Sequence, residues 1–384
     1  MNYLENAFVG CLLGGAIGDA LGYAVEFQRE EQIQAKYGFV KTFVSQPLIS
    51  DDTQMSLYTA VAMEHALGHT PDHDPRKTEM LAKAYLRWYE GQIGEFHGVY
   101  PSFLRFVPYL NQRRSPGNTC MTALGQYAKT KVYPTIENPI NPSKGCGGVM
   151  RVAPIGLIMG KLTEEGGDFP LAETIRFGAE AAAITHGHSL GYISSGYLAG
   201  LIQLIVEKRV ESSLPDLAHE ALQATKEVFG EDKHWNEFEA IMDKAFALAQ
   251  EEKPELDVIH ELGEGWVGEE AIAIALYCCL KHPYSFGDAV AYAVNHNGDS
   301  DSTGAIAGNI LGAYLGLENI RLSFPDYWKV EGCDLIAEIA LDLAHDIPQM
   351  GNPQFQWWVA KYDCLAPKEA IEARWSRFRE RAPR

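Results

Sequence analysis

The sequence lacks several features that define large classes of protein. Segments with the alternating polar and apolar pattern of β-strands are almost absent, and only residues 38–49 would form a short strand or an extended loop. No apolar run reaches the roughly 18 residues of a membrane span, and the N-terminus has no basic segment followed by an apolar core. We therefore expect a helical protein of the cytoplasm that does not bind membranes.

Basic residues are scarce relative to acidic ones. The 384 residues include 32 Lys and Arg against 51 Asp and Glu, a net charge of −19. This balance argues against a general binder of nucleic acid or of anionic membranes, because such binders depend on Lys and Arg. The negative net charge does not exclude binding of a phosphorylated small molecule, since metal ions and backbone N–H groups also bind phosphate.

Common catalytic and cofactor motifs are missing as well. The seven cysteines show no CxxC or zinc spacing, which fits a reducing compartment. GxSxG, the P-loop pattern and a GxGxxG within a βαβ unit do not occur, which excludes the corresponding hydrolase and nucleotide-binding classes. No linker or convincing repeat divides the chain. We predict a monomer with one domain over residues 1–384.

Helical periodicity covers most of the chain. Apolar residues recur at spacings of three and four, whereas residues 91–149, rich in Gly, Pro and Asn, are expected to hold the longest loops, and residues 70–75 a shorter one. The predicted class is therefore all-α. The predicted helices span residues 3–21, 53–67, 77–89, 171–185, 189–208, 214–229, 236–250, 269–281, 286–295, 305–317, 335–345 and 368–381.

Two of these helices carry a glycine at every fourth position. Each such glycine weakens a helix by about 1 kcal/mol relative to alanine, so a row of four indicates close approach by a neighbouring backbone. We predict that both helices lie in the core and pack against other neighbours or against each other. The glycines are Gly10, Gly14, Gly18 and Gly22 in the first helix, and Gly304, Gly308, Gly312 and Gly316 in the second.

Two acidic clusters stand directly before helical segments. One contains Ser50, Asp51 and Asp52, and the other contains Asp299, Asp301 and Ser302. Either cluster alone fits helix capping, with Ser50 or Asp51 as the N-cap of the first. Together they suggest that the two segments meet and hold divalent cations, because clustered carboxylates repel one another unless cations neutralise them. Oxygen ligands favour Mg²⁺ or Mn²⁺, then Ca²⁺.

The second cluster superficially resembles a calcium loop. Counted from Asn297, however, the sixth residue is Ser302 rather than Gly, and the twelfth is Gly308 rather than Glu. An EF-hand is therefore excluded.

Three other residues and one segment are considered in isolation. Glu26 in isolation fits an exposed loop. The glycine-rich segment 145–148 is either a flexible turn or a place where backbone approaches a ligand. His186 in isolation fits a buried, hydrogen-bonded histidine better than a metal ligand, and Trp266 fits equally a core residue or a lid over a base.

Taken in order, these motifs resemble the ADP-ribosylglycohydrolase family, which includes ADP-ribosylarginine hydrolase. The resemblance extends over about residues 5–318. The matching segments are GGAIGDALG at 14–22 with Glu26, SDDT at 50–53, GCGGVMRVAP at 145–154, Thr185-His186, Gly265-Trp266 and GDSDSTG at 298–304.

The resemblance implies a helical bundle of orthogonal type and a site with two Mg²⁺ or Mn²⁺ ions. The implied metal ligands are Ser50, Asp51, Asp52, Asp299, Asp301 and Ser302. The implied catalytic residues are Glu26 and Asp299, of which either orients the water. The implied substrate contacts are Gly145, Cys146, Gly147 and Gly148 for phosphate and ribose, His186 for ribose, and Trp266 for adenine. Many members have Asn where this chain has Cys146.

The implied reaction is hydrolysis of the glycosidic bond between ADP-ribose and an acceptor. Serine at positions 50 and 302 resembles the members that act on arginine, so ADP-ribosylated arginine in proteins is the expected substrate. The alternatives are another acceptor, such as serine, O-acetyl-ADP-ribose or a nucleic-acid base, or a non-catalytic protein that binds ADP-ribose.

Overall fold

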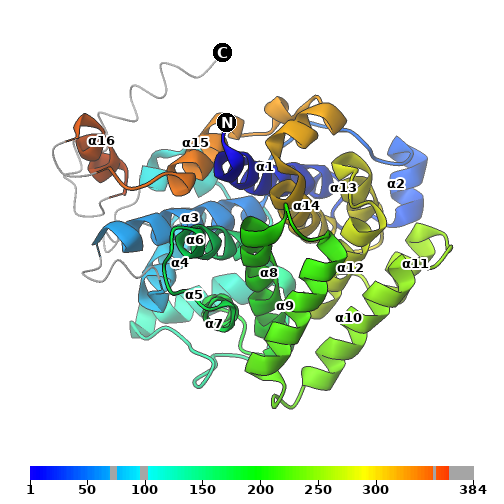
Figure 1. Cartoon of the computed structure of the whole chain (residues 1–384), viewed down its shortest axis with the longest axis horizontal. Coiled ribbons are helices and arrows are strands. Elements are labelled where there is room, and N and C mark those ends of the chain that lie inside the picture. The colour runs from blue at the N-terminus through cyan, green and yellow to red at the C-terminus, as the bar shows by residue number, and fades with distance from the viewer. Residues whose placement is uncertain (70–75, 96–102, 349–351, 363–384) are drawn as a thin grey trace.

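The computed structural model describes residues 1–69, 76–95, 103–348 and 352–362 (Figure 1). Across these residues the regular secondary structure is helical, with a single isolated β-bridge between Gly145 and Val267. The all-α prediction is therefore confirmed. The helices are α1 (Tyr3–Tyr23), α2 (Glu30–Tyr37), α3 (Asp51–His69), α4 (Thr78–Ile93), α5 (Asn118–Thr130), α6 (Ala153–Glu164), α7 (Leu171–Ala183), α8 (Ser189–Lys208), α9 (Leu214–Phe229), α10 (Trp235–Ala249), α11 (Glu255–Leu262), α12 (Gly268–Lys281), α13 (Phe286–Val294), α14 (Ser300–Ser323), α15 (Cys333–Ala344) and α16 (Pro353–Tyr362). Short 3₁₀ helices are η1 (Phe103–Phe106), η2 (Pro108–Asn111), η3 (Cys146–Arg151) and η4 (Tyr327–Lys329).

Most predicted helices occur within a few residues of their expected bounds, but α14 begins five residues earlier than expected. Helix α5 was not predicted, although its buried residues 120, 123, 124 and 127 follow the i, i+3, i+4, i+7 spacing. The flanking glycines and prolines obscured it. Helices α2, α6, α11 and α16 were missed too, and residues 38–49 form no strand. The loop 70–75 and the helix 368–381 lie outside the described residues.

Helices α1 and α14 pack against each other along their length and run antiparallel. The glycine rows face each other: a Cβ added to Gly14 would lie 2.4 Å from the carbonyl oxygen of Gly308, and one added to Gly18 would lie 1.9 Å from that of Gly304. Such contacts leave no room for any side chain, which confirms close backbone approach. Gly316 departs from the predicted regular helix, because its φ of +77° interrupts α14.

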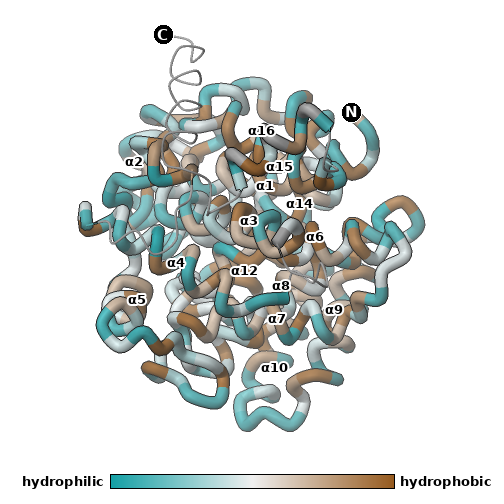
Figure 2. Tube along the Cα trace, turned by 90° about the vertical axis from the view of Figure 1, so that its left-hand side faces the viewer, coloured by the Kyte–Doolittle hydropathy of each residue, from teal (hydrophilic) through white to brown (hydrophobic). Residues whose placement is uncertain are grey.

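The remaining helices surround this pair. In Figure 1, α3 and α6 lie below and to the left of α1, and α13 lies to the right of α14. Figure 2 shows strongly hydrophilic stretches on outer loops, such as those beyond α5. The buried apolar side chains make one cluster that extends from α1 to α16.

By length and hydropathy alone, α1 and α8 could cross a membrane. This differs from the expectation that no such segment exists. Their most apolar windows are 83% and 100% buried inside the fold, as in the core helices of soluble proteins, which pass the same test.

Candidate active site

The two acidic clusters meet in one cavity of about 330 Å³. The first cluster lies at the start of α3 and the second at the start of α14, while Glu26 reaches the cavity from the loop that follows α1. The antiparallel packing explains this placement, because it brings Gly22 at the end of α1 against Ser300 at the start of α14. Of the predicted site residues, the cavity is lined by Glu26, Asp51, Asp52, Gly145, Cys146, Gly147, His186, Trp266, Asp299, Asp301 and Ser302.

Two predicted site residues do not line the cavity. Ser50 is fully buried, and its hydroxyl accepts a hydrogen bond from the amide of Asp52 (3.2 Å). Gly148 packs against α7 instead, where an added Cβ would lie 2.7 Å from the Cβ of Ala182. Its smallness therefore serves helix packing beside the site.

Asp19 joins α1 to the start of α3 and was not predicted. Its carboxylate accepts hydrogen bonds from the amides of Ser50 (3.0 Å) and Thr53 (3.1 Å), and from the Thr53 hydroxyl. It therefore supplies much of the capping that was assigned to Ser50 or Asp51. Burial raises the pKa of Asp19 to about 6, although these hydrogen bonds oppose the rise. The one available signal was a carboxylate within an otherwise apolar helix.

Three carboxylates converge most closely. Glu26, Asp299 and Asp301 each present an oxygen within 4.8 Å of the others. Glu26 is half-buried, so its interpretation as an exposed loop residue is wrong. Burial, followed by the charges of Asp299 and Asp51, raises the pKa of Glu26 to about 8.

The neighbouring carboxyl groups show the same destabilisation of the charged form. Burial, reinforced by nearby carboxylates, raises the pKa values of Asp51, Asp52 and Asp301 well above their usual range. Two buried oxygens, Glu26 Oε2 and Asp52 Oδ2, have no hydrogen-bond partner in the described part of the chain. A set of oxygen donors with unpartnered, mutually repelling carboxylates fits a hard divalent cation.

The loop at 145–148 is held beside this cluster. The amide of Cys146 donates to the Trp266 carbonyl (3.2 Å), and the amide of Gly268 donates to the Lys144 carbonyl (2.7 Å). The Cys146 thiol donates to Asp299 Oδ2 at 2.8 Å, and the Ser302 hydroxyl lies 3.6 Å from the sulfur. This fixed backbone disfavours a flexible turn, and the thiol is placed to orient the Asp299 carboxylate.

An aromatic pair stands at the edge of the cavity. Trp266 is 37% exposed, which rules out the core interpretation, and its ring stacks on that of Phe27 with centroids 5.5 Å apart. Phe27 is 68% exposed and has a φ of +63°, an unfavourable conformation for a bulky residue. Nothing in the sequence distinguished Phe27 from other loop aromatics.

The two histidines of the 186–188 segment have different environments. His186 is 2% exposed and lines the cavity. His188 is the N-cap residue of α8, where its Nδ1 accepts from the amide of Leu190 (3.2 Å). The two side chains therefore differ in role: His186 faces the cavity, and His188 caps a helix.

Comparison with known proteins agrees with this geometry. The family model described as ADP-ribosylglycohydrolase matches residues 2–353. The chain belongs to the ADP-ribosylglycohydrolase family. It is therefore a glycosyl hydrolase that acts on ADP-ribose conjugates, and the resemblance inferred from the motifs is confirmed.

Curated members of the ADP-ribosylglycohydrolase family are similar over most of their length. ADP-ribosylhydrolase ARH3 of Mus musculus is 23% identical, with 85% of this chain and 87% of the relative covered. ADP-ribosylhydrolase ARH1 of Dictyostelium discoideum is 24% identical, with 87% and 92% covered. A solved structure described as an ADP-ribosylglycohydrolase-related protein complex has a TM-score of 0.60 at 22% identity, covering 90% of this chain and 99% of its own. The helical fold is therefore that of the family.

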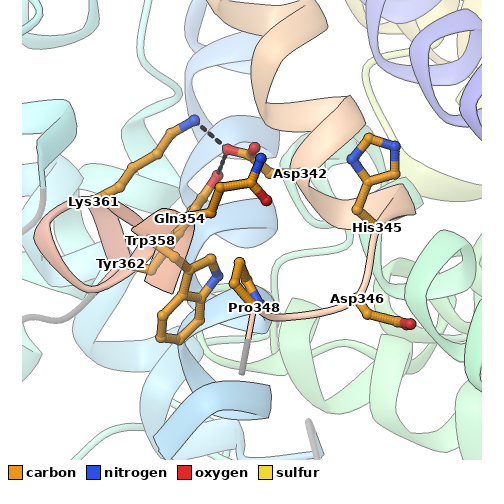
Figure 3. Close-up of a pocket in the computed structure, with 8 residues that line it drawn as sticks. All are labelled: Asp342, His345, Asp346, Pro348, Gln354, Trp358, Lys361 and Tyr362. Atoms are coloured by element: carbon orange, nitrogen blue, oxygen red, sulfur yellow. Dashed lines mark hydrogen bonds and ion pairs between the residues drawn. The ribbon is translucent and has the colours of Figure 1, made fainter. Parts of the chain in front are cut away.

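This ADP-ribosylglycohydrolase also has a larger cavity, of about 480 Å³, beside α15 and α16 (Figure 3). Polar groups there pair with one another: Lys361 and the Tyr362 hydroxyl both contact the Asp342 carboxylate. None of the predicted site residues lies in it, so size alone does not identify the active site. The lining residues are Asp342, His345, Asp346, Pro348, Gln354, Trp358, Lys361 and Tyr362.

Proposed function

We propose that this chain is a hydrolase dependent on two Mg²⁺ or Mn²⁺ ions that removes ADP-ribose from arginine side chains of proteins. The observation that carries the proposal is the meeting of both acidic clusters with Glu26 in one cavity. Bound cations would relieve the repulsion among these carboxylates at neutral pH.

The proposed ligands are the oxygens of the two clusters. They belong to Asp51 and Asp52 at the start of α3, to Asp299 directly before α14, and to Asp301 and Ser302 in its first turn. Ser50, directly before α3, is proposed as a further ligand. Bound divalent ions supply the charge that neutralises these carboxylates and the coordination that orients the ribose hydroxyls. The unpartnered Asp52 Oδ2 supports this assignment.

The residues around the proposed ribose position supply proton transfer, orientation of the water and stabilisation of the transition state. Glu26, whose unpartnered Oε2 is buried and whose carboxylate lies beside Asp299 and Asp301, is suited to exchange a proton with the leaving group or with water. Asp299, held by the Cys146 thiol, is suited to orient the attacking water. Carboxylates close to the anomeric carbon favour the oxocarbenium-like transition state of glycoside cleavage.

Arginine is the proposed acceptor because of Ser50 and Ser302, which resemble the arginine-type members. The second candidate is the same chemistry on another acceptor, namely serine, O-acetyl-ADP-ribose or a nucleic-acid base; the relatives are named as ADP-ribosylhydrolases, which fits either candidate. The substrate test therefore includes these acceptors.

The test measures ADP-ribose release from ADP-ribosylated arginine protein, ADP-ribosylated serine peptide and O-acetyl-ADP-ribose, with and without EDTA. We expect EDTA to abolish release and Mg²⁺ or Mn²⁺ to restore it. Asp301→Asn should lower the rate by about 100-fold or more, whereas Asp346→Asn, on a residue with an 88% exposed side chain outside the site, should leave it unchanged.

Release that resists EDTA, or full activity of Asp301→Asn, would defeat the metal-dependent mechanism. Tight binding of ADP-ribose without turnover on any acceptor would instead support the non-catalytic alternative.

A further inference from the structure

A buried arginine lies next to the cavity without lining it. Arg151, at the end of η3, is fully buried, and its guanidinium lies over the ring of Tyr85 at 4.1 Å. Its NH2 group donates to the Ala181 carbonyl (3.0 Å) and to the Thr185 hydroxyl (2.7 Å). Burying a guanidinium costs free energy unless its N–H groups are hydrogen-bonded, so the partners of Arg151 determine what this side chain does.

The Thr185 hydroxyl links Arg151 to a residue of the cavity wall. Its oxygen lies 2.8 Å from Nδ1 of His186, whose ring lines the cavity. The hydroxyl thus stands between a charged donor and a side chain that faces the proposed substrate. We infer that Arg151 and Thr185 are positioning residues that hold His186 as the tautomer with its proton on Nε2.

The direction of the hydrogen bonds follows from counting donors and acceptors. A guanidinium donates only, so the Thr185 oxygen accepts from Arg151 and keeps one proton to donate. The other nearby acceptors for this proton are the Cys120 sulfur, which is a weak acceptor, and the Ala182 carbonyl at 3.4 Å. That carbonyl already accepts from the amides of Thr185 (3.0 Å) and His186 (2.9 Å), which uses both of its lone pairs.

The hydroxyl proton therefore goes to Nδ1 of His186, and the ring carries its own proton on Nε2. The charge of the donor strengthens this bond, because a hydroxyl polarised by a guanidinium is a better donor. Burial, followed by the charge of Arg151, lowers the pKa of His186 to about 3, so the ring stays neutral. The result is a neutral N–H donor in the cavity wall.

The surrounding loop keeps the ring in place. A Cβ on Gly145 would lie 3.1 Å from Nε2 of His186, and one on Gly147 would lie 3.0 Å from Cε1. The glycines therefore allow the loop to pack against the imidazole edge. No protein acceptor within the described residues takes the Nε2 proton, which leaves it for a ligand oxygen.

The identity of that oxygen rests on the proposed function. For an ADP-ribose conjugate it is a ribose hydroxyl or a phosphate oxygen, since both accept a neutral N–H donor. The imidazole with its proton on Nδ1 would present a lone pair to a phosphate and repel it. Arg151 and Thr185 would thus act on substrate affinity without touching the substrate.

Nitrogen-15 NMR of histidine-labelled protein tests the tautomer directly, with the His186→Gln spectrum used to identify the signals. We expect a protonated-type shift for Nε2 and an unprotonated-type shift for Nδ1 in the wild type. Thr185→Val, which keeps the shape but removes the hydroxyl, should shift the ring towards a mixture of tautomers. Thr185→Ser should preserve the wild-type pattern.

Calorimetric binding of ADP-ribose gives the functional readout. Thr185→Val should raise Kd about ten-fold, the effect of one misplaced hydrogen bond, and Thr185→Ser should restore it to within a few-fold. A wild-type ring protonated on Nδ1, or an unchanged Nε2–H tautomer in Thr185→Val, would overturn the inference. If wild-type protein binds no ADP-ribose, the proposed function fails, while the NMR result still decides the tautomer.

Discussion

The contact between α1 and α14 predicts the effect of one methyl group. In Gly308→Ala the added Cβ would lie 2.1 Å from the carbonyl oxygen of Gly14, whereas real Cβ contacts essentially never fall below 3.0 Å. The two helices would have to separate by about 0.9 Å, and neither backbone can rotate aside because each is fixed by its own helical hydrogen bonds. Overpacking of this kind costs typically 1–3 kcal/mol, occasionally more.

Alanine also has a favourable effect, because it stabilises a helix by about 1 kcal/mol relative to glycine. Gly125→Ala in α5 isolates this gain, since the close neighbour there is the flexible Tyr89 hydroxyl at 2.9 Å. We expect Gly308→Ala to lose about 1 kcal/mol or more in net stability, and Gly125→Ala to lose nothing and to gain up to about 1 kcal/mol. The measurement is urea unfolding followed by far-UV circular dichroism. A Gly308→Ala midpoint equal to that of wild type would refute the close-contact argument.

Two further predictions concern other parts of the chain. Burial raises the pKa of Glu64 from 4.5 to about 7, so its protonated form stabilises the folded state; that stability is present below pH 4.5 and is lost as the pH rises through 7. Glu64→Gln, which keeps the acceptor for Trp358 Nε1 (2.6 Å), should raise the free energy of unfolding at pH 8 by up to about 3 kcal/mol and change it little at pH 4, as measured by unfolding at both pH values. Phe27→Gly removes an unfavourable backbone conformation, worth about 1 kcal/mol, and a ring stack worth about as much. Its thermal stability should therefore match that of wild type, while the indole emission changes as Trp266 becomes more exposed; a fall in melting temperature of many degrees would contradict this.

The sequence predicted the helical class, the glycine contact and the residues that gather in the cavity. These features leave local signals: the spacing of apolar residues, glycine at every fourth position, and carboxylates packed before a helix. The likeness of the two acidic clusters already suggested that Asp51 and Asp301 meet. The family resemblance added site roles for residues such as His186 and Trp266, whose local patterns left other interpretations open.

The missed features depend on tertiary contacts. Asp19 looks like an isolated charge within α1, and only the position of α3 shows that it receives the amides of Ser50 and Thr53. Phe27 owes its importance to the approach of Trp266, and Arg151 owes its importance to the hydroxyl of Thr185. Such pairs produce no periodic pattern in the sequence, because the two partners belong to separate elements of the fold.

The pairing of α1 with α14 also has a consequence for biosynthesis. Helix α1 leaves the ribosome first, but its partner is complete only when residue 323 has been made. At about 5–20 residues per second, some 300 intervening residues take roughly 15–60 s to translate. Throughout that interval α1 would present an apolar surface without its final neighbour, and the active site would lack one of its two halves. The nascent chain is therefore an expected client of chaperones, and catalytic competence arises only after α14 has been made.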